Sequence, residues 1–523
     1  MMGSLRTVAA ALIVFVVAAG TASAAKDPGF KTSQAAMITP VAPGVTVEPI
    51  ITVGETLASG YKFESIPDGI SFQRHGRNID VYVNHETSLV PFPLFPPTTF
   101  FDYTNAMVSK LVLNSQTAGV LEGSYVIPSS ANYQRFCSNF LATRRHGFGD
   151  RPLLLTNEEA TDFVNRTGTA WPAGPGAEQA GLVVAYDVKT GAYRSIYGMG
   201  RHNHENSVAV PDYGYPVVLS GDDTFSAPAS QLYMYTARNG NAVWNDEGAL
   251  WAFRSSDPAT NDYGDLTGSE SVAGEFIPVP REIAVGDQTP LETWSNANNV
   301  FQFIRVEDVA YDRKQTNVVY FADTGEPRAL PDPVTGRLRR GPSGTMGPYP
   351  NGRIFKLVLD RKDPTKVDSL SILIDGDDGG AKNPLEIHQP DNVETTNGSL
   401  FIQEDPGSHN QYAATEPGAT TARIWHYDLA TGTLTVVAKV DQSADPAARL
   451  GAWESSGIVD ASKAFGPGAF LVDVQAGTIS LDRVEGPDGN GDGRPDTVLE
   501  REGGQLLLLR IAGETDVAEP DDD

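Results

Sequence analysis

The chain has 523 residues, a formal net charge of −27 and one cysteine. The acidic balance argues against nucleic acids and anionic membranes as partners, because like charges repel. It is typical both of a protein rich in calcium ligands and of a solvated acidic surface. Because Cys137 has no second cysteine to pair with, stability must come from a large core, from metals or from both.

The first 24 residues have the pattern of a Sec-type signal peptide. Arg6 precedes an apolar run over residues 9–20, and Ala22-Ser23-Ala24 follows as a cleavage site. The run is shorter than the about 20 residues of a membrane-spanning helix, which argues against an uncleaved anchor. We therefore expect a secreted or periplasmic protein without membrane insertion, whose mature chain starts near Ala25.

The rest of the chain has the pattern of short β-strands separated by turns. It contains 52 glycines and 36 prolines, and runs of β-branched and aromatic residues recur between turn residues. Such runs are found at residues 79–83, 153–155, 182–186, 217–219, 317–321, 399–402, 423–427, 469–472 and 505–509. Residues 187–194 and 428–435 repeat one hairpin pattern, in which an aromatic-Asp strand end leads through a Thr-Gly turn to a returning strand.

These strands predict an all-β protein. We expect a single β-propeller of about six blades over residues 25–513, with long loop insertions. A pair of β-sandwiches is the alternative, because the repeats have no fixed period. Surface excursions are expected at residues 85–105, 255–300 and 325–353. Residues 514–523 are expected to form an acidic, disordered tail.

Acidic and amide residues stand at the ends of many predicted strands. They occur at residues 84–86, 157–159, 204–206, 221–223, 307–308, 390–392, 403–405 and 453–455. The innermost strands of a propeller surround one channel, so residues from different blades can converge there. Converging carboxylates stay ionised together only if cations share the site, and oxygen ligands favour calcium or another hard ion. Taken singly, each of these residues is equally a common turn or cap residue.

The order of several motifs along residues 75–475 is more specific than any one of them. The motifs are Asn84-His85-Glu86, Leu155-Thr156-Asn157-Glu158-Glu159, Gly200-Arg201-His202-Asn203-His204-Glu205-Asn206, Ser220-Gly221-Asp222-Asp223, Arg305-Val306-Glu307-Asp308 and Gln389-Pro390-Asp391-Asn392. This succession resembles the PhoX family of alkaline phosphatases. The resemblance implies a six-bladed propeller with calcium and iron on its axis that hydrolyses phosphate monoesters.

The resemblance also implies roles for individual carboxylates. Glu205 and Glu307 would bridge metals or bind on the iron side. Asp222 and Asp391 would hold calcium, with Asp223 as the alternative to Asp222. These assignments predict a metal centre that joins residues from distant parts of the chain.

Further roles concern the substrate. Arg305 would bind the substrate phosphate, because a planar guanidinium suits a phosphate. Arg305 and Glu307 together would form the catalytic pair. Asn84 would donate to phosphate oxygens or orient a ligand, and His204 would orient a ligand.

The expected iron ligand differs from the family pattern. The family's Thr-Cys-Glu-Glu motif supplies a thiolate, whereas this chain has Asn157 and Glu158 at the corresponding metal positions. An amide is a poor substitute for a thiolate, so iron selectivity should be weakened. Cys137 is expected to be a buried structural thiol, with a position in the site as the alternative. The signal peptide also lacks the twin arginines common in the family. Both departures predict a calcium-dominated site.

A separate calcium motif lies near the C-terminus. Residues 488–493 match the first half of an EF-hand loop, but Leu499 stands where the bidentate Glu would be. A smaller structural calcium loop is predicted, with a simple Asp/Gly turn as the alternative. Its ligands would be Asp488, Asn490, Asp492 and Asp496.

The predicted function is an exported phosphomonoesterase that acts on a small phosphate ester with Ca²⁺, and with Fe³⁺ as a further candidate cofactor. Two other classes stay open. One is a calcium-dependent propeller phosphodiesterase or lactonase, and the other is a non-catalytic calcium-binding surface protein. The sequence does not indicate an oligomeric state.

Overall fold

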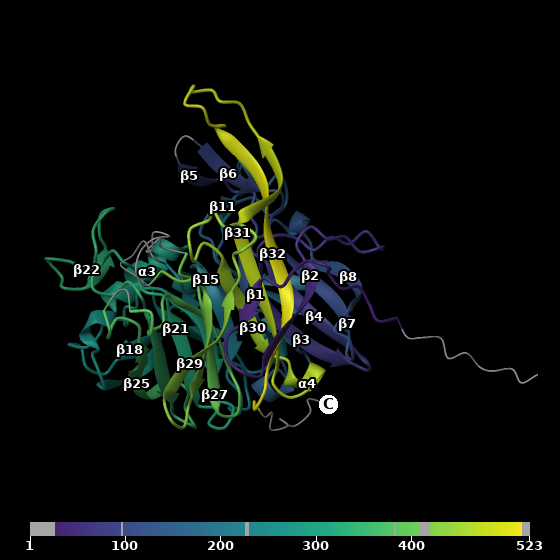
Figure 1. The fold of residues 1–523 in the computed structure, drawn as a ribbon. Helices are drawn as coiled ribbons and strands as arrows, with labels where there is room; N and C mark the ends of the chain where they lie inside the picture. The colour runs from purple at the N-terminus through teal and green to yellow at the C-terminus, as the bar shows by residue number, and fades with distance from the viewer. Residues whose placement is uncertain (1–26, 96–97, 225–229, 381–382, 408–418, 515–523) are drawn as a thin grey trace, which may run out of the picture.

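The computed structural model describes residues 27–95, 98–224, 230–380, 383–407 and 419–514 (Figure 1). Within these residues β-strands dominate and helices are short, which confirms the all-β prediction. The predicted signal peptide lies outside the described residues, as do residues 515–523 of the predicted tail. Glu514, the first residue of that tail, accepts hydrogen bonds from Thr396 and Ser399 and therefore belongs with the propeller.

The first half of the chain builds three blades of antiparallel strands. Blade 1 contains β3 (Pro67–His75), β4 (Asn78–His85), β7 (Met107–Asn114) and β8 (Val120–Ile127). Blade 2 contains β9 (Phe136–Ala142), β10 (Leu153–Glu158), β13 (Val183–Asp187) and β14 (Tyr193–Ile196). Blade 3 contains β15 (His204–Ala209), β16 (Val217–Asp222), β17 (Leu232–Thr236), β18 (Ala249–Ser255) and β19 (Ser271–Pro278).

The second half builds three more blades and uses the N-terminal strands to complete two of them. Blade 4 contains β20 (Val306–Tyr311), β21 (Val318–Asp323), β24 (Arg353–Leu359) and β25 (Lys366–Asp375), and β25 also pairs with β19. Blade 5 contains β26 (Pro390–Thr395), β27 (Ser399–Glu404), β28 (Arg423–Asp428), β29 (Thr433–Val440) and β1 (Ile38–Pro40). Blade 6 contains β30 (Glu454–Asp460), β31 (Ala469–Glu485), β32 (Thr497–Ile511) and β2 (Val45–Thr52).

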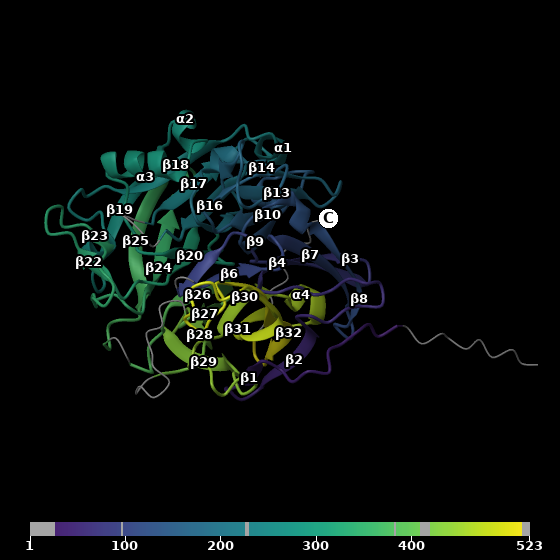
Figure 2. The ribbon, with the colours of Figure 1, turned by 90° about the horizontal axis from the view of Figure 1, so that it is seen from above.

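The first strand of each blade lies at the centre of the molecule. Among the described residues, β3 contacts β9, and β9, β15, β20, β26 and β30 follow one another until β30 returns to β3. Figure 2 shows the blades arranged in this order around a common centre. The fold is therefore a closed propeller of six blades in the described chain, as predicted, and not a pair of sandwiches. Because β1 and β2 come from the N-terminus, the two ends of the chain hold the ring together.

The repeated hairpin pattern marks equivalent turns in two blades. It joins β13 to β14 in blade 2 and β28 to β29 in blade 5. Gly191 and Gly432 have φ angles of +76° and +71°, which glycine adopts without steric cost. Their amides donate to the carbonyls of Asp187 and Asp428, both at 2.8 Å. The sequence repeat is thus a structural repeat.

Short elements fill the predicted excursions and decorate the propeller. They are β5 (Phe92–Phe95), β6 (Thr98–Asp102), β11 (Phe163–Val164), β12 (Glu178–Gln179), β22 (Ala329–Pro331), β23 (Leu338–Arg340), α1 (Gly240–Trp244), α2 (Arg281–Ala284), α3 (Gln288–Ala297) and α4 (Ser462–Phe465), with 3-10 turns at Ser129–Ala131, Arg144–His146, Tyr197–Met199 and Tyr263–Asp265. In Figure 1 the ends of β31 and β32 rise above the blades, beside β5 and β6. None of the helices in the described part of the chain has the length and apolar character needed to cross a membrane.

Candidate metal centre

Potential metal ligands occupy the same position in five inner strands. The second residue of the strand is Asp68 in β3, Cys137 in β9, Glu205 in β15, Glu307 in β20 and Asp391 in β26. In the sixth inner strand, β30, the first residue is an acid, Glu454. All these residues begin strands that surround the axis, so their side chains meet at one end of the channel.

A second set of acidic residues reaches the same end from the neighbouring strands. Each of these residues directly follows the second strand of its blade, which runs antiparallel to the inner strand. They are Glu86 after β4, Glu159 after β10, Asp223 after β16 and Asp405 after β27. Blade 4 has Thr324 at this position. The two sets together surround the axis with oxygen ligands and one thiol.

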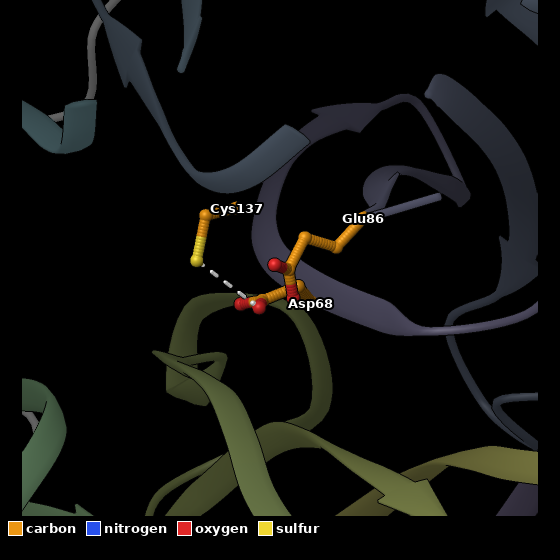
Figure 3. A group of neighbouring side chains, drawn as sticks. All are labelled: Asp68, Glu86 and Cys137. Carbon is orange, nitrogen blue, oxygen red and sulfur yellow. Dashed lines mark hydrogen bonds between the residues drawn. The ribbon is translucent and has the colours of Figure 1, made fainter. Parts of the chain in front are cut away.

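Four overlapping groups of these side chains lie within metal-binding distance. In each group, one ligand atom from every member lies within 4.8 Å of the others. The groups are Asp68, Glu86 and Cys137; Cys137, Glu159 and Glu205; Glu205, Glu307 and Asp391; and Asp391, Asp405 and Glu454. Figure 3 shows the first group, with Asp68 and Glu86 of blade 1 facing Cys137 of blade 2. Since neighbouring groups share a member, the ligands form a continuous arc from blade 1 to blade 6.

Irregular backbone aims these ligands at the axis. In blades 1 to 5 the ladder between the first two strands shifts register across the ligand, as at 67–70 around Asp68 and at 204–207 around Glu205. Such bulges re-aim side chains and are common next to active sites. Ile66, Arg135 and Gln389 have positive φ angles of 49°, 43° and 56°, and each stands two residues before a ligand. A left-handed non-glycine residue costs roughly 1–3 kcal/mol, so the surrounding fold must hold these turns in place.

Neighbouring side chains fix the orientation of the ligands. The Ser138 hydroxyl donates to Glu205 Oε1 at 2.8 Å, and the Thr324 hydroxyl donates to Glu307 Oε1 at 2.5 Å. Gln475 donates from Nε2 to Asp68 Oδ2 at 3.0 Å and to Glu86 Oε2 at 3.2 Å. The Cys137 thiol donates to Asp68 Oδ2 at 3.3 Å (Figure 3). Contacts of this kind hold a ligand set in one geometry.

Arg305 supplies a buried positive charge beside the carboxylates. Its Nε and Nη2 donate to the two oxygens of Asp223 at 2.6 Å and 2.5 Å, a bidentate pair. The same Nη2 lies 3.1 Å from Glu307 Oε1. The guanidinium is therefore held at the edge of the Glu205, Glu307 and Asp391 group.

The electrostatics of the centre favour bound cations. Burial raises the pKa of Asp68 to about 6, and burial together with the charge of Asp68 raises the pKa of Glu86 to about 8. The same causes hold the pKa of five more carboxyls well above the ordinary range: Glu159, Glu205, Glu307, Asp391 and Glu454. Asp68 Oδ1 is buried without a hydrogen-bond partner. Hard cations would satisfy such oxygens and stabilise their ionised form, so the residues fit a metal centre.

Comparisons with known proteins agree with this geometry. A sequence model of the family described as alkaline phosphatase PhoX matches residues 159–446. This chain belongs to the PhoX family. The structure of Pseudomonas fluorescens PhoX in complex with vanadate, a transition state analogue, matches with a TM-score of 0.63 and 16% identity over 94% of this chain and 99% of that chain. That likeness shows a shared propeller fold.

Other solved structures are more distant. A Penicillium chrysogenum alpha-L-arabinanase complexed with arabinobiose gives a TM-score of 0.39 at 8% identity, over 88% of this chain and 98% of that chain. A thermostable family-43 glycoside hydrolase gives a TM-score of 0.32 at 10% identity, over 71% of this chain and 92% of that chain. A search of curated protein sequences finds no match.

The structure brings together three of the metal ligands predicted from the PhoX resemblance. Glu205, Glu307 and Asp391 form one group, although they come from three different blades. Asp223 lies beside them through its pair with Arg305. The predicted catalytic pair, Arg305 and Glu307, is therefore part of the centre.

Three other predicted metal ligands contact residues outside the four ligand groups. Glu158 is buried in blade 2, where Arg166 donates to both of its oxygens at 2.7 Å and 2.8 Å. Asp222 accepts from the amide and hydroxyl of Thr224 and faces His202. Asn157 donates to the Ser138 carbonyl at 2.9 Å. Glu159, the neighbour of Glu158, is in a ligand group, and Asp223, the predicted alternative to Asp222, pairs with Arg305.

Asn84 and His204 lie beside the ligands. Asn84 is fully buried and donates to the carbonyls of Cys137 and Ser138 at 2.5 Å and 3.1 Å, which anchors β9 to β4. The ring of His204 contacts the Ser220 hydroxyl and the Gly200 carbonyl at 2.8 Å and 3.1 Å. These contacts suit orientation of the adjacent strands. The expected donation from Asn84 to a phosphate stays a prediction.

The thiol and one carboxylate were not assigned to the site from the sequence. Cys137 is buried, as expected, and it belongs to two of the ligand groups, so the geometry favours the alternative prediction, a position in the site. Asp68 was missed altogether. Pro67-Asp68-Gly69 begins a strand in the same way as Pro390-Asp391-Asn392, and this parallel was the signal that could have revealed it.

Proposed function

We propose that this PhoX-family chain is an exported, metal-dependent phosphatase that hydrolyses phosphate monoesters. The observation that carries the proposal is Arg305, whose Nη2 lies 3.1 Å from Glu307 Oε1 at the edge of the arc of carboxylates. A guanidinium and metal cations in one site suit a dianionic phosphoryl group. Membership of the PhoX alkaline phosphatase family supports the same reaction class.

We further propose calcium as the main cofactor and iron as a second one. The carboxylate oxygens of the Glu205, Glu307 and Asp391 group suit hard cations. The thiol of Cys137 adds a soft ligand in the neighbouring groups, which suits a transition metal such as iron. Bound cations would neutralise the charge of the phosphoryl oxygens during hydrolysis.

The residues of the chain would position the substrate phosphate. Asp223 holds the guanidinium of Arg305 in a fixed plane through two hydrogen bonds, so Arg305 is preorganised to bind a phosphate. Thr324 holds Glu307, and Ser138 holds Glu205, so neither carboxylate has to reorient when substrate arrives. The described groups of the site would therefore act mainly by orientation and charge.

The loop at residues 488–496 is proposed to hold a structural calcium ion. It lies at the end of the β31–β32 hairpin, where Asp488 accepts from the amides of Gly491 and Gly493 at 2.7 Å and 2.9 Å. Asp496 accepts from the Gly489 amide at 2.8 Å. The loop is thus folded with its carboxylates turned inward, as a small calcium loop requires.

The deciding experiment is hydrolysis of p-nitrophenyl phosphate by the mature chain with calcium, with calcium and iron, and with a chelator. Bis-p-nitrophenyl phosphate and a simple lactone are assayed in parallel. Monoester turnover that is lost with chelator and in Arg305→Ala supports the proposal. Turnover of the diester or lactone that survives Arg305→Ala would instead favour the phosphodiesterase or lactonase. No turnover of any substrate, with calcium still raising the Tm, would leave a calcium-binding surface protein.

A further inference from the structure

An insertion in blade 4 reaches the metal centre at its base. Thr324, which contacts Glu307, donates its amide to the Arg305 carbonyl at 3.0 Å. The chain then continues into the hairpin of β22 and β23 (Figure 1). Ala329 pairs with Arg340 in this hairpin, so its base is the end that joins Thr324. The residues at the base therefore border the Arg305 side of the site.

Two arginines share one buried carboxylate at this base. Glu326 is 2% exposed and lies two residues after Thr324. Its Oε1 is 3.3 Å from Arg328 Nε, and its Oε2 is 3.2 Å from Arg340 Nε. The side chains of Arg328 and Arg340 are 26% and 28% exposed. Two partly exposed guanidiniums therefore meet at one buried carboxylate.

These two guanidiniums lie close to the substrate-binding guanidinium. The positive charges of Arg328 and Arg305 lower the pKa of Arg340, after the larger effect of burial, and the negative charges of Glu326 and Asp223 raise it. Thr324, two residues before Glu326, donates to Glu307 and to the Arg305 carbonyl, so the arginines that contact Glu326 lie on the Arg305 side of the carboxylates. Planar guanidinium groups suit phosphate oxygens, so this side of the site suits a further phosphate.

We propose that Arg328 and Arg340, the arginine pair, bind a second phosphate on the leaving group of the substrate. The preferred substrates would be bisphosphate esters, in which one phosphate is cleaved at the metal centre and the other is held by the arginine pair. The inference rests on the phosphatase function proposed above. Glu326 fixes the two guanidiniums, so they form a preorganised anion site at the rim.

The test compares two esters that differ only in a second phosphate. Initial rates of phosphate release from fructose 1,6-bisphosphate and from fructose 6-phosphate are measured at fixed free calcium for wild type, Arg340→Gln and Arg328→Gln. Arg339→Gln is the matched control, because Arg339 is the neighbour in β23, is 53% exposed and pairs with Asp332 at 3.1 Å. Circular dichroism verifies that each variant is folded.

We expect wild type to prefer the bisphosphate. Arg340→Gln and Arg328→Gln should each lower kcat/KM for the bisphosphate about tenfold, mainly through KM, because each removes a charge-assisted contact. Values for fructose 6-phosphate, and for both esters with Arg339→Gln, should change less than about twofold. Equal losses for both esters, or no loss in either variant, would overturn the inference and leave the phosphatase function intact.

Binding is measured separately, so that failure of catalysis does not hide the result. Calorimetric titration with fructose 1,6-bisphosphate should show weaker binding to Arg340→Gln than to wild type or Arg339→Gln. If wild type turns over neither ester, the proposed function fails, yet this difference in binding would still support the arginine pair. Equal binding by all variants would overturn it.

Discussion

Adjacent acidic residues in blades 2 and 5 have opposite surroundings. Glu158 pairs with Arg166 inside blade 2, whereas the next residue, Glu159, faces the axis. In blade 5 the same division separates Glu404, which binds Arg423, from Asp405 in the ligand arc. Since successive strand residues point to opposite sides, one step along the chain decides between a structural ion pair and a metal ligand.

The two kinds of carboxylate also differ in energy. Glu404 accepts from both the guanidinium of Arg423 at 2.7 Å and the Trp425 indole at 2.8 Å, so its charge is compensated within the fold. Burial and the neighbouring Asp223 instead raise the pKa of Glu159 well above its ordinary range. The axial residues therefore oppose stability in the absence of metal, which is a property of functional sites.

The largest effect is expected for a ligand of the central group. Glu307→Gln should lower kcat for p-nitrophenyl phosphate by about a thousandfold or more, because it removes a charge from the site of reaction. The melting temperature with chelator should not fall, since repulsion among the carboxylates is relieved. Steady-state kinetics and thermal unfolding measure both quantities. Wild-type activity in this variant would show that Glu307 is not part of the active site.

A structural carboxylate should show the reverse pattern. Glu404→Gln should lower the free energy of unfolding by about 3 kcal/mol, because it leaves Arg423 buried without a counter-charge. Asp405→Asn, one residue further on, serves as the matched control and should leave the metal-free stability unchanged or higher. Urea unfolding with chelator tests the pair. Equal destabilisation by both substitutions would remove the distinction between them.

We expect iron binding to depend on the thiol of Cys137 and not on the amide of Asn157. Cys137→Ser should reduce bound iron and lower kcat about 10- to 100-fold, as loss of a soft ligand does. Asn157→Cys should change neither quantity, because the side chain of Asn157 is directed to the Ser138 carbonyl. Elemental analysis of the purified variants measures iron. Gain of iron in Asn157→Cys would restore the assignment made from the sequence.

The pH dependence of stability should depend on metal. The pKa of Glu86 is about 8, against an ordinary value of 4.5, so between these values the folded protein holds a proton that the unfolded chain releases. The free energy of unfolding with chelator should therefore fall as pH rises from about 5 to about 8. Saturating calcium should weaken this trend, and Glu86→Gln should make it shallower. A metal-free stability that rises over this range would contradict the raised pKa.

The smallest effect is expected far from the axis. Asp488→Asn should reduce the rise in Tm that calcium produces and leave kcat unchanged, because the loop holds a hairpin end and not the site. Thermal unfolding with and without calcium measures the rise in Tm. A calcium-induced rise in Tm identical to that of wild type would show that the loop is a simple Asp/Gly turn and not a calcium site.

Much of the fold was predictable from local patterns. The repeated turns at Gly191 and Gly432 identified equivalent hairpins, and the alternation of strands and turns indicated a propeller. The prediction of the site was less complete. Glu205, Glu307 and Asp391 were identified through the family resemblance, but Asp68 was missed, and Glu158 was preferred to Glu159.

By itself the sequence determined the class of the fold, the family and the chemistry of the ligands, because these depend on composition, local pattern and motif order. Only the tertiary structure decided which acids face the axis and that Cys137 joins them. Register shifts and the left-handed residues Ile66, Arg135 and Gln389 set the direction of each ligand. Such irregularities are held by contacts between blades, so no local pattern in the chain specifies them.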